Sequence, residues 1–524
     1  MNKKLPERPD LEQLKKQAKD LLKDIHAAEA QALARVPPNE VAGFALADAQ
    51  RIIAREYGFA SWVKLKERVE LSGPALAARA LIQAALHGNA EKVETILREY
   101  PRMSRAGLQV AAVLGDAVGV RDWLRHDPAL ANKASEEKKW TPLLSACVGR
   151  VGGDDASRAD CVQQLLAAGA NANDYWIDGS FPDSKLSALY GATGINNYPQ
   201  VARVLLAAGA NPNDGESIYH AAEHHHTECL EALLAAGADL SARDPKWSNT
   251  PLYFLLGHSP RTRQAAKARQ GILWLLDHGA DPNVTAYEKA ETPLFQAINN
   301  DWDLELITRL LDCGANPNAR RADGKSAHLF AVCGGRDDVA RLLRERGAVD
   351  ESRPEHFFLG ACASARGDEA RRMIMTHPEW RQTLAPAIDP LLLRLAKEDN
   401  AAAIALIAGL GFGIDAKAEG GERPLHWAAW HGRVAATKVL VQAGANLAEP
   451  DGKFHAPPLG WCVHGSLNCR AVGGDYPGVA EALLAAGARP DGIGKAPLTD
   501  DVAVPEVVAV LRRYEQAGGA TAVQ

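Results

Sequence analysis

The sequence has few aromatic residues, few cysteines and no surplus of either charge. Phenylalanine, tryptophan and tyrosine make up 6% of the 524 residues, and there are 8 cysteines. This cysteine content is too low for a disulfide-stabilised scaffold. The 59 lysines and arginines against 65 aspartates and glutamates give a net charge of −6. Because there is no basic surplus, we expect no nucleic-acid partner.

The sequence also lacks a long apolar run. The longest nearly apolar stretch, 401–414, contains glycines and falls short of the roughly 20 residues that span a bilayer. The first residues, MNKKLPERPD, carry charges but no apolar segment of the kind found in signal peptides. We therefore expect no membrane partner, reduced thiols and a cytoplasmic location.

What the sequence does contain is a repeated phrase. A Leu-Leu pair or a variant precedes two residues, then Gly-Ala and usually Asn or Asp. The glycines of these phrases are Gly169, Gly209, Gly237, Gly279, Gly314, Gly347, Gly444 and Gly487. One interval of 97 residues is divided by Gly411, which predicts two degenerate copies there. A single hydrophobic core stops growing near ~250–300 residues, and a period near 33 indicates a solenoid instead.

Each repeat is predicted to be a pair of helices with recognisable ends. The glycine suits the left-handed position that follows a helix, where a Cβ atom is penalised. Thr-Pro-Leu at 141–143, 250–252 and 292–294 places threonine as the N-cap and proline in the first turn of the other helix.

These features resemble the ankyrin repeat, and RPLHWAAWHGRVAATKVLVQAGAN at 423–446 is the clearest copy. The resemblance implies an all-α ankyrin-repeat solenoid of about twelve repeats over 73–516, with a tail at 517–524. The segment LADAQRIIAREYGFASWVKLKERVE, which begins at Leu46, resembles the leader of bacterial multi-repeat ankyrin proteins. With an amphipathic helix before it, residues 1–72 are predicted to form an N-terminal helical cap.

Aromatic residues mark the expected concave groove. The first helix of each repeat should line this groove, and the long turn at 174–187 should overhang it. Such side chains are typical anchors for a partner protein or peptide, unless neighbouring helices cover them. The candidates are Trp427, Trp430, Trp461, His464, Phe254, Phe330, Trp176 and Tyr175.

A second hypothesis is an enzyme that acts on a small apolar or aromatic ligand. Glu223 occupies a position where the repeat favours a small buried alanine, and a buried carboxylate needs a partner. His220 lies three residues earlier on the same helix face, and Tyr219 and Tyr190 are close in the predicted stack. The ordinary interpretation is that His220 bonds a neighbouring turn and Glu223 tips to solvent.

We expect neither a metal nor a cofactor. Cys462, His464 and Cys469 give only part of a zinc set, and no glycine-rich phosphate loop is present. The insertion at 463–478 has no role that we can assign. The sequence therefore favours a non-catalytic scaffold or adaptor; an inhibitor of a neighbouring gene's product is a third interpretation.

Overall fold

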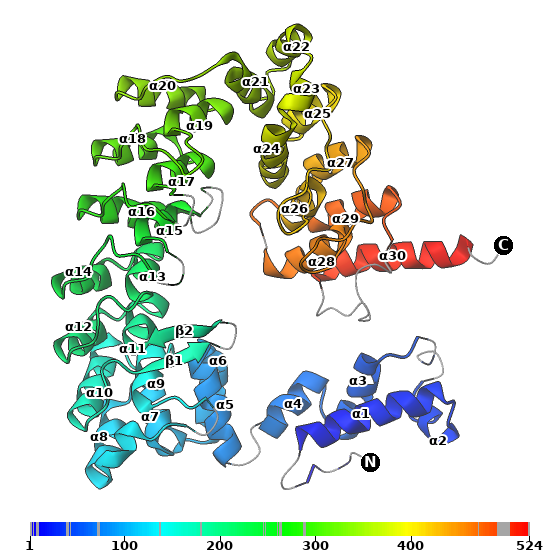
Figure 1. The fold of residues 1–524 in the computed structure, drawn as a ribbon. Helices are drawn as coiled ribbons and strands as arrows, with labels where there is room; N and C mark the ends of the chain where they lie inside the picture. Colours follow the sequence, from blue (N-terminus) through cyan, green and yellow to red (C-terminus); the bar gives the residue numbers. More distant parts are fainter. Residues whose placement is uncertain are drawn as a thin grey trace. The chain divides into compact units, whose positions relative to one another are not determined.

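The protein is represented by a computed structural model. It describes residues 3, 5–6, 10–37, 41, 43–70, 74–135, 138–178, 181–244, 246, 248–258, 260, 265–286, 290–469, 471–489 and 503–521. The chain divides into two compact units, Met1–Asp239 and Leu240–Gln524, which are described separately below (Figure 1).

The first unit opens with four helices that share a hydrophobic core of their own. Leu14, Leu21 and Ile25 of the first helix pack with Ile53 and Leu65 of the later ones. The Ser61 hydroxyl accepts from the backbone N–H of Lys64, which fixes the start of the fourth helix (3.2 Å). A capping role for this segment stays a prediction. The helices are α1 (Leu11–His26), α2 (Ala30–Leu33), α3 (Leu46–Glu56) and α4 (Trp62–Glu70).

Stacked helix pairs fill the rest of the first unit. Within the described residues, the expected long turn at 174–187 is a β-hairpin, whose strands pair Tyr175 with Ser187 and Trp176 with Leu186. A π-helical turn, Gly191–Ile195, continues α11. The elements are α5 (Pro74–Leu86), α6 (Ala90–Glu99), α7 (Leu108–Leu114), α8 (Ala117–His126), α9 (Pro142–Val148), α10 (Asp155–Ala167), β1 (Tyr175–Asp178), β2 (Phe181–Ser187), α11 (Ala188–Tyr190), α12 (Pro199–Ala207), α13 (Ser217–Glu223) and α14 (Thr227–Ala235), with 3₁₀ turns at Met103–Arg105 and Pro128–Asn132.

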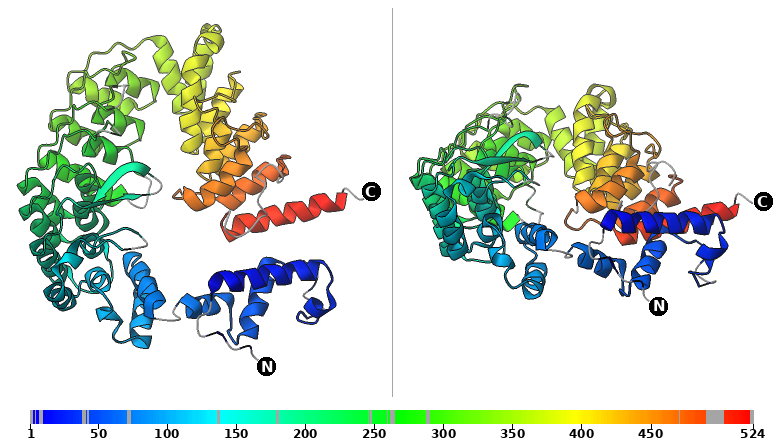
Figure 2. Two further views of the ribbon diagram at one scale, coloured as in Figure 1. Left: turned by 60° about the horizontal axis from the view of Figure 1, so that its bottom comes forward. Right: turned by 90° about the horizontal axis from the view of Figure 1, so that it is seen from below.

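The second unit continues the same pattern of helix pairs (Figure 2). Its last helix reaches Thr521, past the boundary predicted at 516. The helices are α15 (Pro251–Leu256), α16 (Ala265–Asp277), α17 (Pro293–Asn299), α18 (Leu304–Asp312), α19 (Ala327–Cys333), α20 (Asp337–Glu345), α21 (Pro354–Ala363), α22 (Gly367–Thr376), α23 (Trp380–Thr383), α24 (Ala385–Lys397), α25 (Ala401–Gly409), α26 (Pro424–Trp430), α27 (Val434–Gln442), α28 (Pro458–Asn468), α29 (Tyr476–Ala485) and α30 (Pro505–Thr521).

The repeated glycines end the second helix of each pair, as predicted. Gly209 and Gly314 have φ angles of 88° and 91°, and the other glycines of the phrase lie in the same left-handed region. At both positions an added Cβ would meet nothing within 4 Å, so the backbone angle alone selects glycine.

Asparagine side chains then tie each repeat to the next. In the first unit, Asn173 donates to the carbonyl of Gly209 (2.9 Å) and accepts from the N–H of Asn211 (2.8 Å). In the second unit, Asn318 donates to the carbonyl of Gly347 and accepts from the N–H of Val349 (both 2.9 Å). These bonds satisfy backbone groups exposed by the left-handed turn.

The threonine caps form at two of the three predicted sites. Thr141 and Thr250 accept from backbone N–H groups at the starts of α9 and α15 (both 3.3 Å). Thr292 makes no side-chain cap, and its buried hydroxyl has no hydrogen-bond partner. The Thr-Pro pair therefore marks the helix start correctly, although the hydroxyl is not always used.

A buried arginine joins three helices of the first unit. Arg158 of α10 donates through Nη1 to the carbonyls of Val113 and Ala146, at 3.2 and 3.1 Å. Its Nε and Nη2 bond the carbonyls of Gly153 and Val151, at 3.0 and 2.9 Å. The ends of α7 and α9 thus gain donors for carbonyls that the helices leave unpaired, and the positive charge complements their dipoles.

Arg158→Met should lower the free energy of unfolding of the first unit by about 2–4 kcal/mol, because buried carbonyls would lose their donors. Urea unfolding followed by far-UV circular dichroism measures the change. Arg121→Met, on an exposed position of α8, is the matched control and should have little effect. Equal effects of the two substitutions would contradict a capping role for Arg158.

Candidate functional site

The predicted tryptophans meet in one cluster of the second unit, but one of them is not a surface residue. Trp461 is only 6% exposed and belongs to the hydrophobic core. Its indole N–H donates to the Asp451 carboxylate (2.9 Å). The expectation that Trp461 faces an open groove is therefore wrong. Neighbouring helices and the loop before α28 cover it.

Three rings that contact Trp461, and a fourth that contacts one of them, form what we call the aromatic patch: Trp427, Trp430, Phe454 and His464. The centroids of Trp427, Trp430 and Phe454 lie 5.3, 5.6 and 5.9 Å from that of Trp461. His464 lies 5.7 Å from Trp430. Both outer tryptophans are half-buried, and Lys397 covers one ring face of Trp427 at 3.8 Å.

Phe454 is an exposed member of the aromatic patch, at 63%. The sequence analysis missed it because it lies in the loop before α28 and not on a first helix. Asp451 holds this loop by accepting from the backbone N–H groups of Lys453, Phe454 and Ala456. Burial alone would raise the pKa of Asp451, but these bonds and the bond from Trp461 lower it to about 2. The loop anchor is therefore ionised at neutral pH.

The two predicted phenylalanines lie outside the aromatic patch. Phe254 packs edge-on against His258, with centroids 5.0 Å apart. Phe330 packs against Phe295 at 5.9 Å, and the guanidinium of Arg321 lies 5.4 Å from its ring. Phe330 instead lines a cleft described below.

In the first unit, Trp176 of the hairpin lies in a separate row of rings. Its centroid is 5.0 Å from Trp140 and 5.9 Å from Tyr190, and Tyr190 lies 5.3 Å from His220. Tyr175, on the other face of the strand, is exposed, with Lys185 4.6 Å from its ring.

Glu223 pairs with His220, which is one of the two alternatives that the sequence leaves open, and does not tip to solvent. Oε2 of Glu223 lies 2.7 Å from Nδ1 of His220, and a carboxylate oxygen of Glu216 lies 3.2 Å from Nε2. Burial alone would lower the pKa of His220, but bonds and charges from the two glutamates raise it to about 9. Burial, with a contribution from the same carboxylates, raises the pKa of Tyr190 to about 12. Tyr219 is buried.

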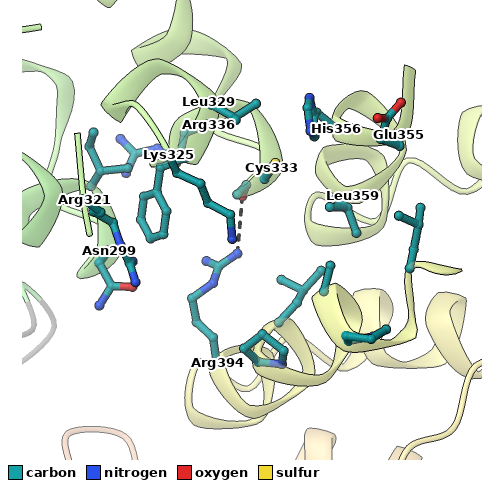
Figure 3. A pocket seen from close by; sticks show the side chains of 18 of the residues that line it. Asn299, Arg321, Lys325, Leu329, Cys333, Arg336, Glu355, His356, Leu359 and Arg394 are labelled. Atoms are coloured by element: carbon teal, nitrogen blue, oxygen red, sulfur yellow. Dashed lines mark hydrogen bonds between the residues drawn. The ribbon is translucent and has the colours of Figure 1, made fainter. Parts of the chain in front are cut away.

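A third feature is a cleft of about 680 Å³ in the second unit (Figure 3). Helices α17, α19, α21 and α24 contribute its walls. Basic side chains stand at its edge and apolar side chains form its floor. The residues used below are Lys325, Arg394, Leu329, Leu359, Leu384 and Leu391. Burial raises the pKa of the Cys333 thiol in this cleft to about 11, so it is not a thiolate at neutral pH.

Parts of the sequence match known families of ankyrin repeats. Residues 154–244 and 263–353 match the family of ankyrin repeats in three copies, and 420–452 match the single ankyrin repeat. The chain is an ankyrin-repeat solenoid. The interval 354–419, where the sequence predicts two degenerate repeats, lies outside these matches, and the edge of the cleft formed by α24 falls within it.

Several known proteins are similar to parts of this ankyrin array. The B-cell lymphoma 3 protein homolog of Mus musculus is 31% identical over 163 residues, which are 29% of this chain and 34% of the relative. The E3 ubiquitin-protein ligase KEG of Arabidopsis thaliana is 24% identical over 349 residues, 57% and 20% of the two chains. The solved ankyrin repeat domain of human ASB11 is 24% identical, with 47% and 99% coverage and a TM-score of 0.36.

This chain therefore spans 34% and 20% of the lengths of these two curated relatives. They come from a mouse and a plant, so the resemblance to a bacterial group stays a prediction.

None of the helices among the described residues is long and apolar enough to cross a membrane. Within the same residues, no three His, Cys, Asp or Glu side chains are grouped as metal ligands, and the thiol of Cys462 bonds the Tyr476 carbonyl (3.3 Å).

The His220 cluster should make stability depend on pH. The pKa of His220 is raised in the fold, so its stabilising contribution is complete below about pH 6.5 and is lost as pH rises through about 9. His220→Gln should lower the free energy of unfolding by about 1–2 kcal/mol at pH 6 and by almost nothing at pH 10.

Urea unfolding at several pH values measures this difference. The control is His87→Gln, an exposed histidine whose Nδ1 bonds the carbonyl of Gln83 (2.7 Å). A difference between wild type and His220→Gln that stays constant from pH 6 to 10 would contradict a charged His220.

Proposed function

We propose that this ankyrin array is a non-catalytic scaffold or adaptor that binds a partner protein or peptide through the aromatic patch. The observation that carries this proposal is the arrangement of half-buried Trp427 and Trp430 with exposed Phe454 and His464 around a buried ring. Tryptophan and tyrosine with arginine dominate binding hot spots, and such anchors lie in well-packed surroundings.

The aromatic patch is also held in place before a partner arrives. Trp461 and its bond to Asp451 fix the loop that carries Phe454. Rings that are already ordered lose little conformational freedom on binding, which lowers the entropic cost of association. The patch thus combines apolar area with a rigid support.

The relatives support binding rather than a particular reaction. A ubiquitin ligase is among them, yet this chain is similar to only a fraction of its length. The enzyme hypothesis has less support, because Glu223 and His220 are bonded to each other and line none of the clefts described. The identity of the partner and the cytoplasmic location stay predictions.

Trp430→Ala combined with Phe454→Ala should remove partner binding while leaving the array folded, because Phe454 is exposed and Trp430 is only partly buried. Quantitative affinity purification from host lysate, followed by native mass spectrometry, should show at least a tenfold loss of a stoichiometric protein. Far-UV circular dichroism and thermal unfolding check the fold.

Two controls separate binding from stability. Phe357→Ala removes another exposed phenylalanine of the same unit, outside the aromatic patch, and should keep the partner. Trp461→Ala should instead destabilise the array by about 3–5 kcal/mol, because it empties a core site. Absence of any protein partner for wild type, or equal recovery by the double variant, would contradict the proposal.

A further inference from the structure

The cleft lies where the regular stacking of first helices is interrupted. On either side of the cleft a first helix packs closely on the next, as α19 does on α21 and α24 on α26. Between α21 and α24 the packing is looser, and α24 begins after the additional short helix α23. The apolar side chains of α24 that would meet a close neighbour therefore line an open space.

The floor of the cleft is apolar. Leu329 and Leu359 face it from α19 and α21, and Leu384 and Leu391 come from the segment that forms α24. Pro386 and Pro390 also line it, and Pro390 lies inside α24, where it lacks the N–H that would bond the preceding turn. Leucine side chains in such a space gain free energy when another apolar group displaces water.

Two positive charges converge above this floor. Lys325 and Arg394 extend toward each other across the cleft (Figure 3). Lys325 has a side chain that is 52% exposed, with Asp323 3.4 Å away. Arg394 bonds Glu398 at 3.1 Å through Nη1, while its Nη2 reaches only the Gly334 carbonyl, at 3.4 Å. Like charges that face one another favour an anion between them.

The other charges around the cleft are more fully used. Arg321 pairs with Glu291 at 3.1 Å, and Arg336 pairs with Asp301 at 2.8 Å. Burial lowers the pKa of His356, and its Nδ1 accepts the backbone N–H of Arg353 (3.0 Å), so it adds no charge at neutral pH. Glu355, an acidic residue that also lines the cleft, pairs with Arg353 at 3.4 Å. Lys325 and Arg394, each beside a single carboxylate, are therefore the cations most open to a ligand.

We propose that this cleft receives an acidic, leucine-rich type of peptide segment from a partner protein. A glutamate or aspartate side chain would bridge Lys325 and Arg394, and the flanking aliphatic side chains would lie on the leucine floor. A basic segment would be repelled, and a neutral one would supply no carboxylate to bridge the two cations. This inference rests on the proposed function, since its occupant is a peptide, but it names a different surface from the aromatic patch.

Selection of a random twelve-residue peptide library, displayed on phage, against the full-length protein tests the proposal. Each selected peptide is then bound to wild type, Lys325→Glu and Lys438→Glu. Lys438 is exposed on α27, outside the cleft, and is the matched charge control. We expect enrichment of Glu or Asp beside Leu, Ile or Phe, with at least a tenfold weaker affinity for Lys325→Glu and an unchanged affinity for Lys438→Glu.

Other outcomes overturn the proposal. These are enrichment without acidic residues, equal binding to Lys325→Glu, or no peptide specific to wild type. Leu329→Ala should also weaken the selected peptides, whereas Phe454→Ala should not. Peptides that are lost only in Phe454→Ala would leave the aromatic patch as the binding surface and contradict the role of the cleft. These variants therefore distinguish a failure of the cleft proposal from a failure of the aromatic patch proposal.

Discussion

The array depends on one backbone geometry, the left-handed glycine that ends the second helix of a repeat. Its carbonyl accepts a hydrogen bond from an asparagine side chain of the preceding repeat. Gly209 accepts from Asn173 in the first unit, and Gly347 accepts from Asn318 in the second. A single repeat cannot bury its apolar side, so stability comes from contact with the next. The glycine turn sets the chain direction that makes this contact possible, and the asparagine fixes its register.

Because the stacking of the repeats is regular, the places where it is interrupted have distinct side-chain contacts. Arg158 joins the ends of α7 and α9 by hydrogen bonds to their carbonyls. Trp461 fills the space between repeats and carries a loop through Asp451. In the second unit, the loose packing between α21 and α24 opens the cleft. In each case the repeated helix pairs are kept, and only the contacts around the unusual residue or gap differ.

The aromatic patch and the cleft offer different kinds of recognition within one unit. The patch presents rings on a rigid support, whereas the cleft combines a leucine floor with converging Lys325 and Arg394. Apolar contact supplies most of the free energy of association, and the charge pair supplies selectivity. The His220 cluster of the first unit differs from both, because its one cation already pairs with two carboxylates, those of Glu216 and Glu223.

The sequence by itself determined the repeated helix pairs and their ends, because helix caps and left-handed glycines are local properties of a few residues. It also indicated the pairing of His220 with Glu223, which lie three residues apart on one helix, as one of two alternatives. Only the tertiary structure decided that Trp461 is buried, that Phe454 joins it and that Lys325 approaches Arg394. Exposure and convergence of this kind depend on how neighbouring repeats pack, and residues far apart in the chain carry no local signal of that packing.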